Sequence, residues 1–140
     1  MTATHEPFAQ FATTVHEDWV DYNGHMNDSF YGVVCGQANE VFLEHLGLSA
    51  SYRERTGAAV YTVEAHLYFR KEARAGEPIA ASSVVESFDA KRLWVATTLF
   101  DGGGTEILRA RYLYLHVGKD GVVPFPADRV AALEAATQQS

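Results

Sequence analysis

The chain has 140 residues, of which 47% are hydrophobic, and its formal net charge is −7. This length and apolar content fit one domain spanning residues 1–140 with a substantial core, and they argue against disorder. A negative surface repels nucleic-acid phosphates and anionic headgroups, so we expect neither nucleic acid nor a membrane as a partner.

The single cysteine, Cys35, cannot form an internal disulfide, and its apolar neighbours indicate a reduced, packed thiol. Residues 1–10 lack the basic start and apolar run of a secretory signal. No stretch approaches the roughly 20 apolar residues of a membrane span. These features together predict a cytoplasmic protein.

The predicted elements begin with a strand over residues 8–16 and a turn-rich loop over residues 17–26. A long helix follows, because apolar side chains recur there at the spacing of a helical face. The main members of that face are Phe30, Val34, Gln37, Val41 and Leu46, and it is widened by Val33, Ala38 and Phe42.

The ends of this helix carry their own signals. Asn27 or Asp28 can serve as the N-cap, and Gly47 fits the C-terminal stop. Gly32 and Gly36 lie one turn apart in the interior, where each costs about 1 kcal/mol relative to alanine. We therefore expect another element, such as a curling sheet, to pack closely against the helix there.

A run of strands follows. Residues from about 58 to 70 alternate between two faces, and the apolar face carries Tyr61, Val63, Ala65, Leu67 and Phe69. Further strands are expected at 79–88, 93–100 and 107–117, with turns at 76–78, 89–92 and 101–104 and a short helix at 126–136. Such short connections favour antiparallel hairpins. One long helix beside about five mostly antiparallel strands is an α+β two-layer domain.

The segment from Trp19 to Asn27 is the most informative about chemistry. It places the carboxylate of Asp21 a few residues before a buried helix, whose N-terminus offers backbone N–H groups and a positive dipole end. Such a site stabilises a thioester oxygen that gains charge during attack, and Gly24 lets the backbone approach a substrate closely. The same residues also fit an ordinary cap and an ordinary Asn23-Gly24 turn, so a structural role stays open.

The motif Asp21-x-x-Gly24-His25-Met26-Asn27 resembles the Asp-x-x-Gly-His-Val-Asn signature of hotdog thioesterases of the 4-hydroxybenzoyl-CoA thioesterase class. The resemblance covers roughly residues 12 to 126. Four further segments are similar to one subgroup, which acts on betainyl-CoA and related carnitine-derived thioesters; these segments are 61–66, 72–76, 91–93 and 115–117. The resemblance implies a hotdog fold, with a curved antiparallel sheet wrapped around the long helix. It also implies hydrolysis of a small acyl-CoA thioester, with no cofactor beyond the CoA of the substrate.

By this resemblance Asp21 is the catalytic carboxylate, acting either as a nucleophile that forms a mixed anhydride or as the general base for water. His25 and Asn27 match motif positions that shape the loop and bind water or the thioester. Two nearby aromatic residues, Trp19 and Tyr22, are candidates to face the acyl group, as is Tyr31 on the helix. Aromatic residues in such positions also pack in cores or interfaces.

Three charged residues are further candidates for substrate binding. The resemblance suggests Glu64 as the counter-ion of a cationic acyl group, although its strand face points away from the helix and also suits a solvent-facing residue. Lys91 and Arg92 lie in a tight turn and could grip CoA phosphates, although exposed basic turn residues often bind nothing specific. No metal site is expected, because metal-ligand spacing is lacking among His5, His16, His45, His66 and His116.

Two other functions remain open. A hotdog hydratase uses Asp and His in a different motif, with one more residue between them than the three that separate Asp21 from His25. A non-catalytic CoA- or acyl-binding protein could keep the same fold. Exposed sheet edges need a partner, and hotdog relatives place their active sites between subunits, so we expect a homodimer or a dimer of dimers.

Overall fold

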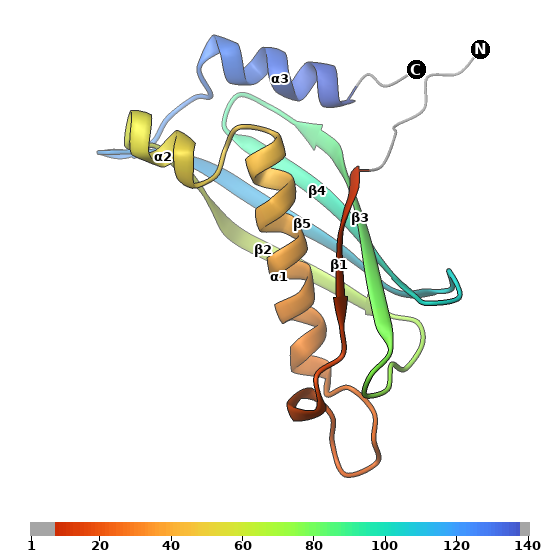
Figure 1. The fold of residues 1–140 in the computed structure, drawn as a ribbon. Coiled ribbons are helices and arrows are strands. Elements are labelled where there is room, and N and C mark those ends of the chain that lie inside the picture. Colours follow the sequence, from red (N-terminus) through yellow and green to blue (C-terminus); the bar gives the residue numbers. More distant parts are fainter. Residues whose placement is uncertain (1–7, 138–140) are drawn as a thin grey trace, which may run out of the picture.

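The computed structural model describes residues 8–137 as one curved sheet with three α-helices (Figure 1). His5 and most of the segment considered as a secretory signal lie outside the described residues. The helices are a short 3₁₀ turn η1 (Glu17–Trp19), α1 (Asp28–His45), α2 (Ala50–Thr56) and α3 (Ala127–Thr137). The strands are β1 (Phe8–Thr14), β2 (Ala59–Phe69), β3 (Pro78–Phe88), β4 (Arg92–Asp101), β5 (Glu106–Gly118) and β6 (Gly121–Val122).

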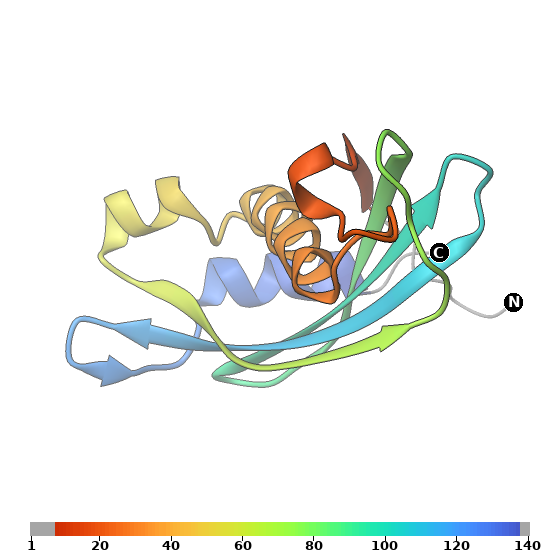
Figure 2. The same ribbon diagram turned by 90° about the horizontal axis from the view of Figure 1, so that it is seen from below.

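The strands pair in the order β1-β3-β4-β5-β2, with β6 added to β5, and every pairing is antiparallel. The sheet curves, and α1 lies against its concave side (Figure 2). This arrangement confirms the expected α+β hotdog fold. The strand β2 forms one edge of the sheet.

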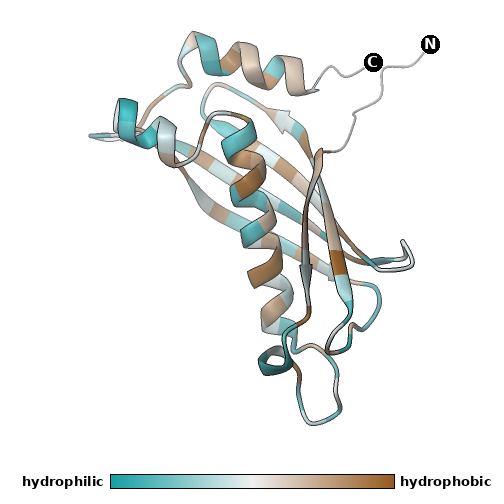
Figure 3. Cartoon of the chain, in the orientation of Figure 1, coloured by the Kyte–Doolittle hydropathy of each residue, from teal (hydrophilic) through white to brown (hydrophobic). Residues whose placement is uncertain are grey.

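The helix α1 begins and ends where the sequence predicts. The side chain of Asn27 caps it by accepting a hydrogen bond from the Ser29 N–H at 3.0 Å. Just beyond its end, Gly47 adopts φ +71°, and Arg129 of α3 donates to the Leu46 carbonyl at 2.7 Å. Polar and apolar segments alternate along α1 (Figure 3), and its buried face consists of Tyr31, Val34, Cys35, Ala38, Asn39, Phe42 and Leu43.

The expected close packing at the two helix glycines is wrong for the single chain. A Cβ atom built on Gly32 or Gly36 would meet no atom within 4 Å. Both residues lie on the side of α1 that the sheet does not cover. The sheet wraps only the opposite face of the helix, so this surface is left open to a partner.

The expected single apolar face of β2 is also wrong, because of a bulge between Thr62 and Glu64. Tyr61 pairs with Leu115, whereas Ala65 pairs with Tyr112, and these two β5 residues are three apart and so face opposite ways. One extra residue in β2 thus reverses the facing of Tyr61 relative to Ala65. Most of β2 is exposed as well, since the strand is an edge.

Three short elements were not predicted: η1, α2 and β6. The seven residues of α2 are too few to show a helical period, although Gly57 ends it with φ +76° and Tyr52 anchors it in the core. The terminal helix α3 was expected at residues 126–136 and is shifted by one residue toward the C-terminus. None of the described helices is long and apolar enough to cross a membrane.

Candidate active site

The loop between η1 and α1 is a closed turn. The Asp21 N–H donates to the His25 carbonyl at 2.9 Å, and the Gly24 N–H donates to the Asp21 carbonyl at 2.9 Å. Gly24 adopts φ +78°, a left-handed conformation that suits glycine. Val20 and Met26 pair as an isolated antiparallel bridge, which closes the neck of the loop.

The carboxylate of Asp21 is held by the backbone of its own loop. Its Oδ1 atom accepts hydrogen bonds from the Asn23 N–H at 2.8 Å and from the His25 N–H at 3.3 Å. The hydrogen bonds found among the described residues leave Oδ2 without a donor. One carboxylate oxygen therefore fixes the orientation of the group, and the other is available for chemistry.

The loop is fastened to the segment that follows β2. The Met26 N–H donates to the Ala73 carbonyl at 2.7 Å. The hydroxyl of Tyr31, on the first turns of α1, accepts from the Ala73 N–H at 3.1 Å and donates to the Lys71 carbonyl at 3.3 Å. Burial raises the pKa of Tyr31, so it remains a neutral donor. These bonds make the start of α1, the loop and residues 71–73 one unit.

This unit surrounds a cavity of about 390 Å³, called the loop cavity below. Asp21, His25 and Tyr31 line it, which brings three of the expected site residues together. His25 Nε2 is 3.2 Å from Glu72 Oε2, yet it is buried and the two atoms are not aligned for a hydrogen bond. A buried ring nitrogen without an aligned partner among the described residues can bind a water molecule or a substrate oxygen.

Basic residues at the end of β2 also line the loop cavity. Lys71 Nζ lies 2.6 Å from Asp101 Oδ2, and this pair raises the pKa of Lys71 and lowers that of Asp101. Arg70 Nε lies 3.5 Å from Glu106 Oε2. Because both cations have acidic partners, the cavity wall is less positive than its sequence suggests.

The N-terminus of α1 is partly occupied by its own cap. Asn27 Oδ1 accepts from the Ser29 N–H, and the Asn27 carbonyl accepts from the Phe30 N–H at 3.0 Å. Two of the N–H groups expected to be free at this helix N-terminus, those of Ser29 and Phe30, therefore already have acceptors. Asn27 acts here as a helix cap and does not line the loop cavity.

Two of the expected aromatic residues also lie away from the loop cavity. The ring of Trp19 stacks on Phe30 with ring centroids 5.6 Å apart, and its backbone carbonyl accepts from the Asn27 N–H at 2.8 Å. Tyr22 is 98% exposed at the tip of the loop. Within one chain, then, Trp19 supports the start of the helix and Tyr22 contacts solvent.

The three charged candidates lie far along the sheet from Asp21. Glu64 is on the convex face, where its Oε1 is 3.1 Å from His66 Nε2. Arg92 forms an ion pair with Asp89 at 2.7 Å in the β3–β4 turn, next to Lys91. The single chain does not bring these three residues into the loop cavity.

Phe69 and Glu72 also line the loop cavity, although neither was among the expected site residues. Phe69 is the last residue of β2 and Glu72 follows it, more than 40 residues after Asp21. The only signal was the similarity at residues 72–76, which includes Glu72 but not Phe69. Within residues 8–137, no group of three or more His, Cys, Asp or Glu side chains is arranged to hold a metal ion.

Comparisons with known proteins agree with this geometry. A sequence model of the thioesterase-like superfamily matches residues 15–133. A betainyl-CoA thioesterase of Pseudomonas aeruginosa is 34% identical over 128 residues, which are 89% of this chain and 80% of that protein.

A second relative, the L-carnitine dehydrogenase/betainyl-CoA thioesterase of Agrobacterium fabrum, is 36% identical over 103 residues. That stretch is 74% of this chain but only 21% of that protein, so the chain spans about a fifth of this relative. Among solved structures, a Staphylococcus aureus protein in complex with CoA has a TM-score of 0.89 at 22% identity, covering 100% of this chain and 90% of that chain. At that identity the likeness concerns the fold alone.

Proposed function

The chain belongs to the thioesterase-like superfamily, and on that premise we propose that it hydrolyses a small acyl-CoA thioester to the free acid and CoA, with Asp21 as the reacting carboxylate. The observation that carries the proposal is the carboxylate itself. One oxygen of the Asp21 carboxylate is fixed by two backbone N–H groups, and Asp21 lines the loop cavity beside the start of α1. A carboxylate so oriented suits either general-base or nucleophilic catalysis.

This geometry allows two routes of thioester hydrolysis. As general base, Asp21 takes a proton from water while the water oxygen attacks the carbonyl carbon, the C–S bond breaks, and the CoA thiolate takes up a proton. As nucleophile, Asp21 attacks the same carbon, the thiolate leaves, and water then hydrolyses the mixed anhydride. His25 Nε2 is placed to bind the water or the thioester oxygen. Either route needs only the thioester and water, so no cofactor is involved.

We also propose that the working unit is a homodimer, or a dimer of dimers, formed along β2. An unpaired edge strand of 11 residues invites pairing with a second copy. The sides of α1 at Gly32 and Gly36 are open as well, since a Cβ atom there would meet nothing within 4 Å. Six large hydrophobic side chains are exposed on α1 and β2: Val33, Val41, Tyr61, Val63, Tyr68 and Phe69.

A dimer also offers a place for the distant candidates. Glu64, Lys91 and Arg92 reach a loop cavity only if they belong to the partner subunit, and Trp19 and Tyr22 contact substrate only if the loop moves or a partner covers it. The two named relatives act on betainyl-CoA, which supports a short acyl group bearing a quaternary ammonium. We also place the enzyme in the cytoplasm, a reducing compartment in which Cys35 would stay a free thiol.

The test is a panel of acyl-CoA thioesters with thiol release as the readout, run on the wild type and on Asp21→Asn. Asparagine keeps an oxygen that can accept the two backbone N–H groups, so the loop should keep its shape. We expect kcat to fall by about 10²–10⁴-fold or more. Near wild-type turnover in a well-folded variant would refute the role of Asp21. Hydration of crotonyl-CoA in place of thiol release would favour a hydratase, and CoA binding without turnover a non-catalytic protein.

A further inference from the structure

A second cavity, called the distal cavity below, lies between the C-terminal half of α1, α2 and the start of β2. It measures about 620 Å³. Apolar side chains form much of its wall, including Leu43, Leu48 and Val60. It opens to solvent, and nothing in the catalytic geometry of Asp21 uses it.

The charges on the wall of the distal cavity indicate the kind of ligand. Glu40 and Glu54 line it together with a single base, Arg53. The hydroxyl of Ser49 donates to Glu40, which holds that carboxylate at the wall. The excess of negative charge disfavours the phosphates of CoA and favours a cation.

A quaternary ammonium fits this wall well because it donates no hydrogen bonds. It needs apolar contact around its methyl groups and carboxylates at a distance. Leu43 and Leu48 supply the first, and Glu40 and Glu54 supply the second.

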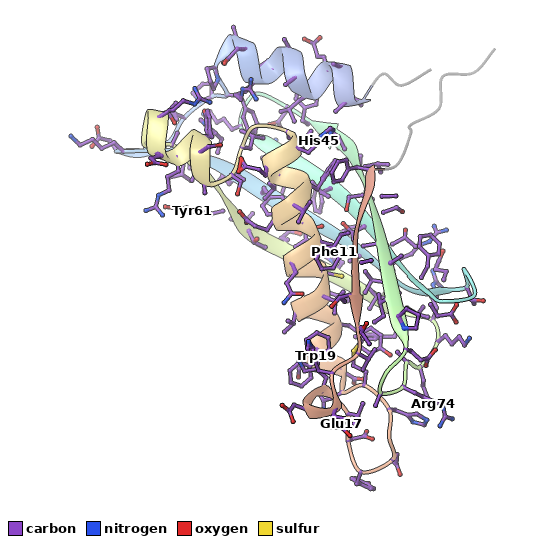
Figure 4. All side chains as sticks on the ribbon, viewed as in Figure 1. Phe11, Glu17, Trp19, His45, Tyr61 and Arg74 are labelled. Atoms are coloured by element: carbon purple, nitrogen blue, oxygen red, sulfur yellow. The ribbon has the colours of Figure 1, made fainter. Side chains whose placement is uncertain are left out.

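Within one chain the distal cavity lies too far from Asp21 to hold the acyl end of a thioester that reacts there. The helix α1 has 18 residues and is about 27 Å long at 1.5 Å per residue. The loop cavity is at its N-terminal end and the distal cavity at its C-terminal end. Figure 4 shows the same separation, with Trp19 and Arg74 near the loop and Tyr61 near α2.

Pairing of two β2 edges about a two-fold axis removes this separation. The loop cavity touches the last residue of β2, Phe69, and the distal cavity touches its first residues, Ala59 to Tyr61. In an antiparallel pair the end of one strand lies beside the start of the other. In a dimer paired in this way over the full length of β2, each loop cavity would lie next to the distal cavity of the partner subunit.

We propose that the distal cavity of one subunit receives the quaternary ammonium end of the acyl group while the thioester lies at Asp21 of the partner, with Glu40 as the principal counter-charge. This inference rests on the proposed thioesterase function and deepens it by naming the substrate class and the residues that select it. The acyl groups concerned are short chains that end in a trimethylammonium.

The first experiment measures kcat/KM for betainyl-CoA and for its neutral isostere 3,3-dimethylbutyryl-CoA. The wild type should prefer the cation, and Glu40→Gln should lower the ratio of the two values by about tenfold, equivalent to about 1.4 kcal/mol. Glutamine can still accept from Ser49, so the variant should fold, and Glu54→Gln provides a second test. The matched control is Glu44→Gln, on the next turn of α1, because Glu44 accepts from Ser51 at 2.8 Å and does not line the cavity.

The second experiment asks whether Glu40 acts on the partner's thioester. Asp21→Asn and Glu40→Gln chains with different affinity tags are co-expressed, and the doubly tagged dimer is purified. If the site is shared between subunits, the mixed dimer holds one site with both Asp21 and Glu40, and its substrate ratio equals that of the wild type. If each chain serves itself, the only site that keeps Asp21 lacks the Glu40 carboxylate. The ratio then equals that of the Glu40→Gln homodimer, which would overturn the shared site.

Other outcomes separate this inference from the proposed function. Normal hydrolysis with a ratio unchanged by Glu40→Gln and Glu54→Gln overturns the distal site alone. A ratio lowered by Glu64→Gln and not by Glu40→Gln does the same and assigns the cation to the convex face. A wild type that hydrolyses no thioester overturns the proposed function and this inference with it.

Discussion

The side-chain nitrogen of Asn39 lies 3.0 Å from the hydroxyl oxygen of Tyr114 and donates a hydrogen bond to it, in the core between α1 and β5. The Thr97 hydroxyl donates to Asn39 Oδ1 at 2.6 Å, and the Ser83 hydroxyl is 3.0 Å from that of Thr97. This buried network ties α1 to β3, β4 and β5. Unlike apolar contacts, it fixes the position of the helix along the sheet.

Tyr114→Phe should therefore destabilise the protein. The change leaves a buried Asn39 N–H without its acceptor, which costs about 1–3 kcal/mol in the free energy of unfolding. Urea denaturation measures this difference. Tyr68→Phe is the matched control, because Tyr68 is exposed on β2 and the same hydroxyl is lost there. Equal stabilities of the two variants would show that the network contributes nothing.

The same part of the core predicts a loss of stability at alkaline pH. Burial raises the pKa of Cys35 to about 12 and that of Tyr114 to about 12, and it raises the pKa of Tyr112 as well. In the unfolded chain these groups ionise at their ordinary pKa values of 9 to 10, whereas the folded protein keeps them neutral to higher pH. Their contribution to stability is therefore complete below pH 9 and is lost as the pH rises toward 12.

Each such group contributes a slope of up to about 1.4 kcal/mol per pH unit. Denaturant midpoints measured between pH 8 and pH 11 should fall steadily above pH 9. Removal of one titrating group in Cys35→Ala should make the fall shallower, although the variant starts from a lower stability. A flat profile to pH 11 would contradict the buried, neutral state of these side chains.

Local signals let the sequence predict the limits of α1 and the turn at Asp21. The Asn27 cap, the Gly47 stop and the Gly24 turn are each set by residues within a few positions along the chain, and the structure has all three. The facing of Tyr61 could not be predicted, because the bulge in β2 depends on how that strand pairs with β5. Phe69 and Glu72 were missed for a related reason, since only the fold brings the end of β2 to the loop.

Assembly along β2 can be tested by placing a charge on that edge. Val63 is 51% exposed in the single chain, and Val63→Glu would put a carboxylate beside Glu64 at the proposed dimer contact. We expect light scattering to report a dimer for the wild type and a monomer for the variant. Thioesterase activity should fall in the monomeric variant, because each site is proposed to need the partner.

Val122→Glu is the control for this change. Val122 is 46% exposed on β6, away from β2, and should tolerate a charge without dissociation. A wild type that is fully active as a monomer would refute both the dimer and the shared site. Dissociation of both variants would show only a general effect of added negative charge, and the β2 contact would then lose its support.

The last prediction concerns Tyr31, which holds the wall of the loop cavity in place. Its hydroxyl accepts from the Ala73 N–H and donates to the Lys71 carbonyl, and Ala73 is buried. Tyr31→Phe keeps the aromatic ring, which packs edge-on against Phe69 with ring centroids 5.2 Å apart, but it leaves the Ala73 N–H without its acceptor. We expect unfolding to become easier by about 1–3 kcal/mol.

Activity should change as well, because residues 69–72 line the cavity and the Ala73 carbonyl holds Met26 of the loop. A displacement of about 1 Å at Asp21 can lower kcat by up to about 100-fold. Hydrogen exchange at the Ala73 amide provides a readout independent of turnover, and it should become faster in Tyr31→Phe but not in Tyr68→Phe. Faster exchange with a lower kcat and an unchanged KM identifies Tyr31 as a positioning residue. A raised KM with unchanged exchange would instead mean that the hydroxyl contacts the substrate directly.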